Sequence, residues 1–395
     1  MKIVYLVNDA GVYGANLSLI NMIKGLGISR DVFVILPSGG PFVALLESLS
    51  IPYKITPFRY NSYIYKNNVL SVFLYVFRLI YYCVLNKYAY YIILDFIKKN
   101  NIGLIHTNNT RVSVGFKVAK KMNIPHIWHL RDLLDLHFSM RPFVGFEKLC
   151  KDYNESTFVI CVSNIVKLHF SIKDSSSIVI YDAVESVKNI SFERADKDNY
   201  FIYCGILSKS KGVFDALYAF SKIAKNRDVK LYLAGTGTPS ITKKIKHIIV
   251  NEKLTNRVVL LGYRNDVKSL MKRSRALLMC SENEAYGRVT AEAMLNDCIV
   301  IGRNSGGTAE LIEHEKTGFL YNTNEELIFL MEKVLNMDTT DIQNRAKKKA
   351  INSFTEEVYA EQLKQPSYLQ PIITQYFIDN KSEIWLLFLI AHSKR

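Results

Sequence analysis

Two glutamates, Glu284 and Glu292, stand eight positions apart in the stretch CSENEAYGRVTAEAM at 280–294. Apolar spacing predicts a strand at 276–281 and a helix at 288–295, so Glu284 lies in a loop and Glu292 in the second helical turn. A helix amino end attracts phosphate through its backbone N–H groups, and here these belong to Ala285, Tyr286, Gly287 and Arg288. Carboxylates accept hydrogen bonds from hydroxyls, so the stretch predicts a site for a phosphorylated sugar. Two solvated glutamates are the alternative that spacing alone leaves open.

The composition bounds the class of protein. A chain of 395 residues with 49% hydrophobic residues predicts two ordered domains. The net charge of +15 indicates an anionic partner. The six cysteines form no C-x-x-C pair, which is typical of reduced thiols in a cytoplasmic protein. The first residues lack a signal-peptide core, and Arg78 at the centre of the apolar run 69–85 argues against a membrane span.

Short buried strands alternate with helices through most of the chain, which predicts an α/β fold with parallel sheets. The rhythm stops in the polar stretch 184–199 and then restarts. We therefore expect one doubly wound domain at 1–183 and a second at 184–355, with ligand bound beyond the carboxyl ends of the strands. The tail 356–395 is expected to pack back on the first domain, although Pro366 and Pro371 break any single helix in it.

The stretch E-A-Y-G-R-V-T-A-E-A-M resembles the E-x7-E signature of the retaining glycosyltransferases of family GT4, and the resemblance extends over residues 1–355. It implies the GT-B fold, two facing Rossmann-like domains, and a nucleotide-sugar donor. In that family the residue that matches Glu284 contacts hydroxyls of the donor sugar, and the one that matches Glu292 contacts the ribose. The resemblance to bacterial polysaccharide-assembly enzymes of the capsule and O-antigen type implies a role in cell-surface polysaccharide biosynthesis.

Further stretches of the second domain match the family. G-I-L-S-K-S-K-G, which begins at Gly205, resembles the G-R-L-x-x-x-K-G loop, and Lys211 matches the lysine that pairs with the donor diphosphate. A surface lysine without function is the alternative. Ile206 replaces the family's arginine, a loss that commonly costs on the order of 10² to 10³ in rate unless Lys209 or Arg288 compensates. V-V-L-L-G-Y resembles the family's strand and turn beside the nucleobase, which implies that the backbone around Tyr263 reads the base, and N-S-G-G-T-A-E-L-I resembles the family's glycine turn.

The first domain supplies two more candidates. G-V-Y-G-A-N, at 11–16, resembles the glycine loop that approaches the donor phosphates, with Gly14 as the expected contact. His129, in I-W-H-L-R-D, resembles the family's histidine close to the transferred sugar, although a structural role is the alternative and His106 is a competing choice. The catalytic set expected is therefore His129, Lys211 and Glu284.

The aromatic and basic region 58–100 has two interpretations. It can lie in the interface of an anionic membrane, or it can pack against the first sheet. A lipid-linked glycan acceptor would explain its charge and its apolar residues together, and would place the protein in the cytoplasm, peripheral to the inner face of the cell membrane.

The motifs and the resemblance together predict transfer of a sugar from a UDP-sugar or GDP-sugar to a glycan or polyprenyl-linked glycan, and the resemblance implies retention of configuration. No cofactor or metal is expected, since D-K-D at 196–198 lies in the polar linker. No nucleic-acid motif is present. A nucleotide-sugar-binding protein with impaired catalysis, which Ile206 would explain, and a nucleotide-sugar epimerase of the same fold are the alternatives.

Overall fold

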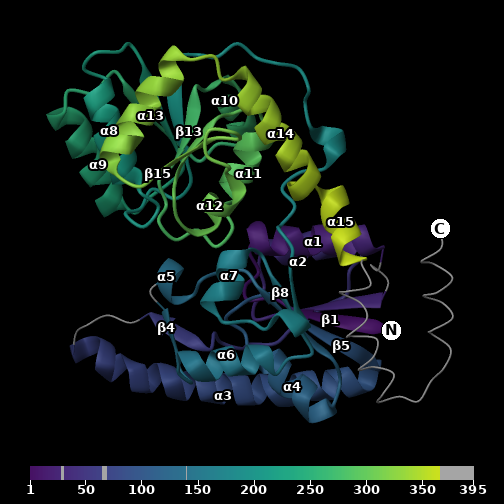
Figure 1. Cartoon of the computed structure of the whole chain (residues 1–395). Helices are drawn as coiled ribbons and strands as arrows, with labels where there is room; N and C mark the ends of the chain where they lie inside the picture. The colour runs from purple at the N-terminus through teal and green to yellow at the C-terminus, as the bar shows by residue number, and fades with distance from the viewer. Residues whose placement is uncertain (28–30, 65–68, 139, 365–395) are drawn as a thin grey trace. The chain divides into compact units, whose positions relative to one another are not determined.

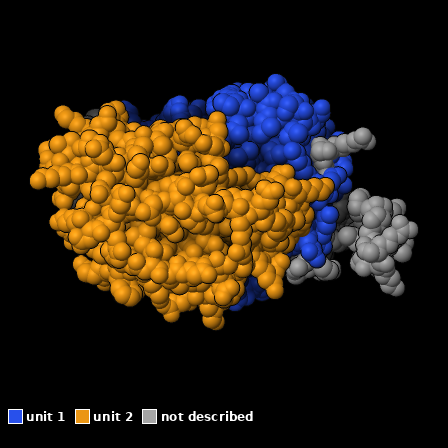
Figure 2. Space-filling view, turned by 90° about the horizontal axis from the view of Figure 1, so that it is seen from above, with its two compact units in different colours: residues 1–162, 166–180, 360–395 blue, residues 163–165, 181–359 orange. Residues whose placement is uncertain are grey.

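The computed structural model describes residues 1–27, 31–64, 69–138 and 140–364. The described chain divides into two compact units (Figure 2). Unit 1 contains Met1–Val162, Val166–Ile180 and, among the described C-terminal residues, 360–364. Unit 2 contains Ser163–Ile165 and Tyr181–Tyr359.

Unit 1 is built on a seven-stranded parallel sheet of order β3-β2-β1-β5-β6-β8-β9. Its inner strands are apolar runs buried along most of their length, as parallel strands covered on both faces must be, whereas its two edge strands are only partly buried. Their bounds are β1 (Lys2–Leu6), β2 (Val32–Leu36), β3 (Tyr53–Ile55), β5 (Ile102–Thr107), β6 (His126–Leu130), β8 (Phe158–Cys161) and β9 (Ser177–Val179). A separate antiparallel pair joins β4 (Ser62–Ile64) to β7 (Met140–Pro142).

Helices cover both faces of this sheet. Figure 1 shows α3 and α4 on one face and α1 on the other. The helices are α1 (Gly14–Leu26), α2 (Pro41–Ser48), α3 (Val69–Asn100), α4 (Val114–Met122), α5 (Asp135–Phe138), α6 (Phe146–Asn154) and α7 (Asn164–His169), followed by the short η2 (Asp174–Ser176). Ala89, Ile93 and Ile97 of α3 share one apolar core with β1, β5 and α4.

The region 58–100 therefore packs on the first sheet through one side of α3, as one of its two interpretations predicts. Its opposite side is exposed, with Phe77, Val84 and Tyr91 each about 60% accessible, so membrane contact stays a prediction. Within the described residues, no helix is both long enough and apolar enough to cross a membrane.

Unit 2 is a second doubly wound unit. Its six parallel strands have the order β12-β11-β10-β13-β14-β15. They are β10 (Tyr200–Cys204), β11 (Lys230–Ala234), β12 (Val258–Gly262), β13 (Ala276–Met279), β14 (Val300–Arg303) and β15 (Phe319–Tyr321). The helices are α8 (Val213–Ile223), α9 (Pro239–Asn251), α10 (Val267–Arg273), α11 (Arg288–Leu295), α12 (Gly306–Leu311), α13 (Asn324–Asn336) and α14 (Thr340–Phe354), with η3 (Val187–Asn189) before the sheet. Helix α15 (Glu356–Leu363) begins in unit 2 and ends in unit 1. Apolar residues of α8, α9 and α13 pack on the sheet in one core.

The boundaries of the units differ slightly from the predicted domains. The chain leaves unit 1 after Ile180, three residues before the predicted boundary, and the segment Ser163–Ile165, in which α7 begins, belongs to unit 2. Glu310 holds this segment there, because it accepts hydrogen bonds from the backbone of Asn164 and Ile165. The return to unit 1 begins at Ala360, close to Gly25 of α1, where an added Cβ would lie 2.7 Å from the Ala360 side chain. The prediction for the rest of the tail, including Pro366 and Pro371, lies outside the described residues.

Candidate active site

The loop between β13 and α11 has the expected strand–loop–helix form, and α11 begins at Arg288. Gly287 is its N-cap, with a φ of 88° that L side chains rarely adopt. The glycine turn at the start of α12 holds this loop, because the Gly307 N–H donates to the Glu284 carbonyl at 2.7 Å. A Cβ on Gly306 would lie 2.6 Å from that carbonyl oxygen. The turn is therefore made of glycine because the two backbones meet here.

Lys211, in the loop between β10 and α8, contacts the loop that carries Glu284. Its Nζ lies 2.7 Å from Glu284 Oε1, and the two side chains are only 20% and 14% exposed. The next residue, Gly212, has a φ of 71°, and a Cβ there would lie 2.1 Å from the Cys280 carbonyl oxygen. The lysine loop, residues 205–212, packs closely on the end of β13. This packing brings together a cation and a carboxylate that are 73 residues apart in sequence. Such a pair can hold a diphosphate and a sugar hydroxyl.

Arg288 is oriented differently from its expected role. Its guanidinium donates to Glu292 Oε1 at 2.9 Å and to the backbone carbonyls of Ala183 and Val184 at 2.9 and 3.2 Å. The side chain is therefore engaged with the segment that enters unit 2, and it is poorly placed to compensate for Ile206. Lys209 and Ile206 are both exposed on the lysine loop.

The start of α11 also presents backbone N–H groups, which, unlike the Arg288 side chain, have no hydrogen-bond acceptor among the described residues. None of the hydrogen bonds found among the described residues uses the N–H groups of Ala285, Tyr286, Gly287 or Arg288 as a donor. They form the amino end of the helix beside Glu284, where a phosphate would find donors and a favourable dipole.

Tyr286 has a structural side chain. It is buried, its hydroxyl donates to the Asp182 carbonyl at 2.8 Å, and its ring stacks on Tyr181. Burial raises the pKa of the Tyr286 hydroxyl well above its ordinary value, so the group stays protonated as a donor. Only its backbone can take the predicted part in the site.

Gly205 follows β10 and Tyr263 follows β12, the two strands that flank β11 in the sheet. Tyr263 is 79% exposed directly after β12. Gly205 lies against Gly235, where an added Cβ would lie 1.8 Å from the Gly205 carbonyl oxygen. Gly235 directly follows β11. The contact gives it a steric role that only the fold shows.

In unit 1, polar side chains gather at the carboxyl ends of β1, β5 and β6. His129 Nδ1 lies 3.2 Å from an Nη atom of Arg131, whose Nε donates to Asn108 Oδ1 at 2.9 Å. The Asn108 side chain in turn donates to the Ala15 carbonyl at 3.1 Å, next to Gly14 at the start of α1. Sequence reasoning missed Arg131 and Asn108, although both lie in the two motifs that carry the histidines.

His129 and His106 are buried side by side, with ring centroids 5.7 Å apart. Burial, and then the charge of Arg131, lower the pKa of both imidazoles well below the ordinary value, so both are neutral at physiological pH. Their Nε2 atoms have no hydrogen-bond partner among the described residues. Because His129 is wholly buried, the predicted contact with a sugar would require its surroundings to open, and it stays a prediction.

No group of three His, Cys, Asp or Glu side chains in the described part of the chain is arranged to hold a metal ion. Asp198 of the D-K-D stretch instead pairs with Arg273 at 2.8 Å. Independence from metal remains a prediction.

The two parallel-sheet units are those of the GT-B fold. Residues 187–353 match the family model of glycosyl transferases group 1. An uncharacterised glycosyltransferase of Methanocaldococcus jannaschii is 30% identical over 257 residues, which are 63% of this chain and 69% of the relative. The chain therefore belongs to the glycosyl transferases group 1 family.

Other relatives match over shorter segments. The N-acetyl-alpha-D-glucosaminyl L-malate synthase of Bacillus anthracis is 35% identical over 126 residues, or 32% of each chain, so the match spans about a third of that enzyme. A Campylobacter jejuni 4-alpha-N-acetylgalactosaminyltransferase, whose name specifies a diphospho-undecaprenol substrate, is 25% identical over 163 residues, 40% of this chain and 43% of that enzyme.

The structure of Anabaena HepE in complex with UDP superposes with a TM-score of 0.73 at 24% identity. The alignment covers 92% of this chain and 98% of the Anabaena chain. At this identity the likeness shows the fold alone.

Proposed function

We propose that the protein transfers a sugar from a nucleotide diphosphate sugar, a UDP-sugar or GDP-sugar, to a hydroxyl of a glycan acceptor with retention of configuration. The observation that carries this proposal is the contact between Lys211 and Glu284 next to the amino end of α11. Lys211 and the backbone N–H groups of 285–288 hold the diphosphate, and Glu284 accepts hydrogen bonds from the sugar. Glu292 binds the ribose, while the backbone at Gly205 and Tyr263 borders the nucleotide.

The reaction breaks the bond between the anomeric carbon and the diphosphate oxygen and forms a bond from that carbon to the acceptor oxygen. The acceptor proton passes to the departing phosphate oxygen on the same face. Lys211 and the helix end stabilise the negative charge that grows on the leaving group. His129 and Gly14 of unit 1 complete the proposed set, and no step requires a metal.

We further propose a lipid-linked acceptor and a position at the inner face of the cell membrane, in cell-surface polysaccharide biosynthesis. The exposed apolar side of α3 and the net charge of +15 support this part. The named substrate of the Campylobacter relative agrees with it.

A thermal-shift screen against UDP, GDP, ADP and their sugars tests donor binding, because a ligand that binds the native state raises the melting temperature. Lys211→Ala should abolish most of the shift, whereas Lys225→Ala, which removes an exposed lysine of the same unit with no assigned role, should keep it. Absence of any nucleotide shift in the wild type would contradict the proposal.

A transfer assay with the donor that gives the largest shift then tests catalysis. Donor binding without transfer to any member of a panel of glycan and lipid-linked acceptors would favour the impaired nucleotide-sugar-binding protein that Ile206 suggests. Interconversion of the donor sugar without acceptor would indicate an epimerase.

A further inference from the structure

A pocket of about 330 Å³ lies in unit 1 between the β4–β7 pair and the first half of α3. We call it the arginine pocket, and its main lining residues are Arg59, Tyr63, Arg78, Tyr82, Met140 and Phe143. Its volume falls near the lower end of the range for small-molecule sites, about 300–1,000 Å³. It is separate from every residue assigned above to donor binding.

The pocket is positively charged. Among the described residues that line it are two arginines and no acidic side chain. The Arg59 guanidinium lies 4.8 Å from the centre of the Tyr81 ring and donates to the Tyr81 hydroxyl at 3.1 Å. Arg78 donates to the Ile64 carbonyl at 3.3 Å. Neutral groups of the protein thus orient both guanidinium groups, which leaves their positive charge available to a phosphate group.

The walls of the pocket are aromatic and mutually packed. The Phe143 ring stacks on Tyr63 and on Tyr82, with centroids 5.1 and 4.9 Å apart. The Tyr82 hydroxyl lies 3.2 Å from Ser113 Oγ, and this hydrogen bond fixes the orientation of the Tyr82 ring on α3. An apolar chain attached to the phosphate would therefore find a preformed apolar wall.

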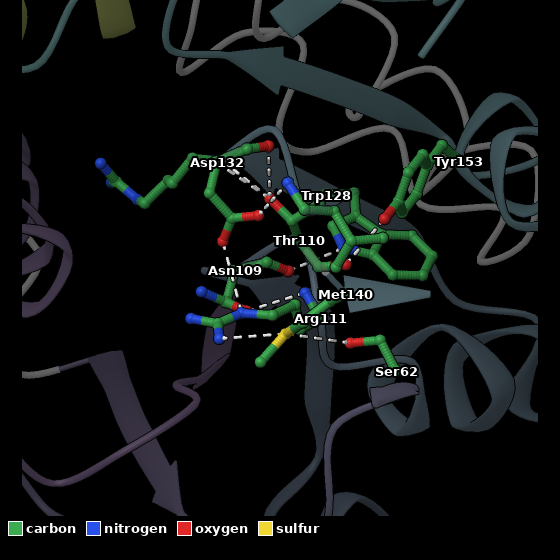
Figure 3. A network of polar contacts seen from close by, with 10 residues as sticks. Ser62, Asn109, Thr110, Arg111, Trp128, Asp132, Met140 and Tyr153 are labelled. Carbon is green, nitrogen blue, oxygen red and sulfur yellow. Dashed lines mark hydrogen bonds and ion pairs between the residues drawn. The ribbon is translucent and has the colours of Figure 1, made fainter. Parts of the chain in front are cut away.

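A buried polar network joins the pocket to the carboxyl edge of the sheet (Figure 3). Arg111 Nε lies 3.4 Å from Asp132 Oδ2. Arg111 Nη1 lies 3.7 Å from the sulfur of Met140, which lines the pocket. The carbonyl of Arg111 accepts from the Asn61 N–H at 2.8 Å, and Arg111 itself follows β5 by four residues. The pocket is thus anchored beside the strand ends where ligands of parallel sheets bind.

Beyond the pocket, α3 presents a continuous apolar strip to solvent. The strip consists of Phe77, Ile80, Tyr81, Val84, Tyr88 and Tyr91, each at least half exposed, at three- and four-residue spacing. From 77 to 91 it extends about 21 Å at 1.5 Å per residue. Tyr81 belongs to both the strip and the pocket, so a chain that leaves the pocket meets the strip directly.

We propose that the arginine pocket binds the phosphate of a long-chain lipid phosphate, with the start of the chain against the aromatic wall and α3 lying in the membrane interface. This proposal rests on the proposed function and deepens it, because it assigns the anchor of the lipid-linked acceptor to named residues. The two arginines supply the charge, the ring wall contacts the chain, and the α3 strip faces the bilayer.

The test measures binding to two kinds of phosphatidylcholine vesicles, one containing polyprenyl phosphate and the other phosphatidylglycerol at equal surface charge. The pocket variant carries Arg59→Gln and Arg78→Gln. Its matched control carries Lys87→Gln and Lys98→Gln, which remove the same charge from exposed positions of α3 outside the pocket. We expect the wild type to prefer polyprenyl phosphate, the pocket variant to lose this affinity at least tenfold, and the control to keep the preference.

A second measurement uses farnesyl phosphate as a soluble probe, with saturating nucleoside diphosphate present to occupy the donor site. The pocket variant should lose binding of this probe. Val84→Asp, a change at an exposed position of the strip, should keep probe binding but weaken binding to vesicles. This variant keeps the idea testable if the double arginine variant folds poorly.

Equal binding to the two kinds of vesicle, or equal losses in the pocket variant and the control, would overturn the proposal in favour of general attraction to anionic membranes. A concentration-dependent dimer that Val84→Asp disrupts, without lipid binding, would overturn it in favour of a second copy on α3. The nucleotide thermal shift of the same variants reports separately on the proposed function, so failure of one does not imply failure of the other.

Discussion

The contact between Lys211 and Glu284 predicts opposite effects on nucleotide affinity for changes in its two partners. The two charged atoms are 2.7 Å apart, and the side chains are 20% and 14% exposed. A hydrogen bond between charged groups is worth about 1.5–3 kcal/mol. A diphosphate that takes Lys211 must give up this contact, which reduces its net affinity.

We therefore expect Lys211→Ala to weaken nucleoside diphosphate binding about 10- to 100-fold, since about 1.4 kcal/mol corresponds to tenfold. Glu284→Gln keeps the side-chain shape but releases the lysine, so it should strengthen nucleoside diphosphate binding about 3- to 10-fold after allowance for partial exposure. Its sugar-transfer rate should nevertheless fall on the order of 10² to 10³, because a charged partner of the sugar is lost.

Isothermal titration with the nucleoside diphosphate of the largest thermal shift measures both effects, and a transfer assay measures the rate. Glu282→Gln is the control, since it removes the same charge from a carboxylate in the same loop that is 66% exposed. If Glu284→Gln and Lys211→Ala weakened nucleotide binding by the same factor, or if Glu282→Gln behaved like Glu284→Gln, the assigned competition for the lysine would be wrong.

Two further predictions concern stability. Gly212→Ala should lower the melting temperature by several degrees, because its φ of 71° strains an L residue by about 1–2 kcal/mol and the new Cβ would meet the Cys280 carbonyl at 2.1 Å. Gly262→Ala, with a φ of 66° but no neighbour within 4 Å, should cost only the backbone strain, and equal losses would contradict the steric reasoning. Burial lowers the pKa of His126 in the folded protein to about 3. In the unfolded chain a histidine has a pKa of about 6.5. Between these two pH values only the unfolded chain binds the proton, so the free energy of unfolding falls as the pH drops below about 6.5. Urea unfolding at about pH 7.5 and about pH 5.5 should therefore show a smaller pH effect for His126→Gln than for the wild type or for the exposed His247→Gln, and an undiminished pH effect in His126→Gln would refute this cause.

Much of the fold could be predicted from the sequence, because its signals are local. Apolar runs marked most strands of both sheets, although β8 and β15 were not predicted, and the helix after Glu284 begins at Arg288 as the spacing predicts. Gly212 before α8 and Gly306 at the start of α12 were visible as turn residues, but their steric partners were not, since Cys280 and Glu284 are distant in sequence.

The region of α3 shows where periodicity is insufficient. Its apolar residues surround the helix, so the pattern could not separate a side that packs on the sheet from a side that faces solvent. Tertiary packing decided this, because Ala89, Ile93 and Ile97 meet β1 and β5 while Val84 and Tyr91 do not.

The sequence by itself determined the residue types of the site and the elements that carry them, because both depend on neighbours within a few positions. Only the tertiary structure decided which charges meet. It paired Lys211 with Glu284, committed the guanidinium of Arg288 to the carbonyls of Ala183 and Val184, and buried His129 beside His106. These outcomes depend on the register and packing of distant segments, which no local pattern encodes.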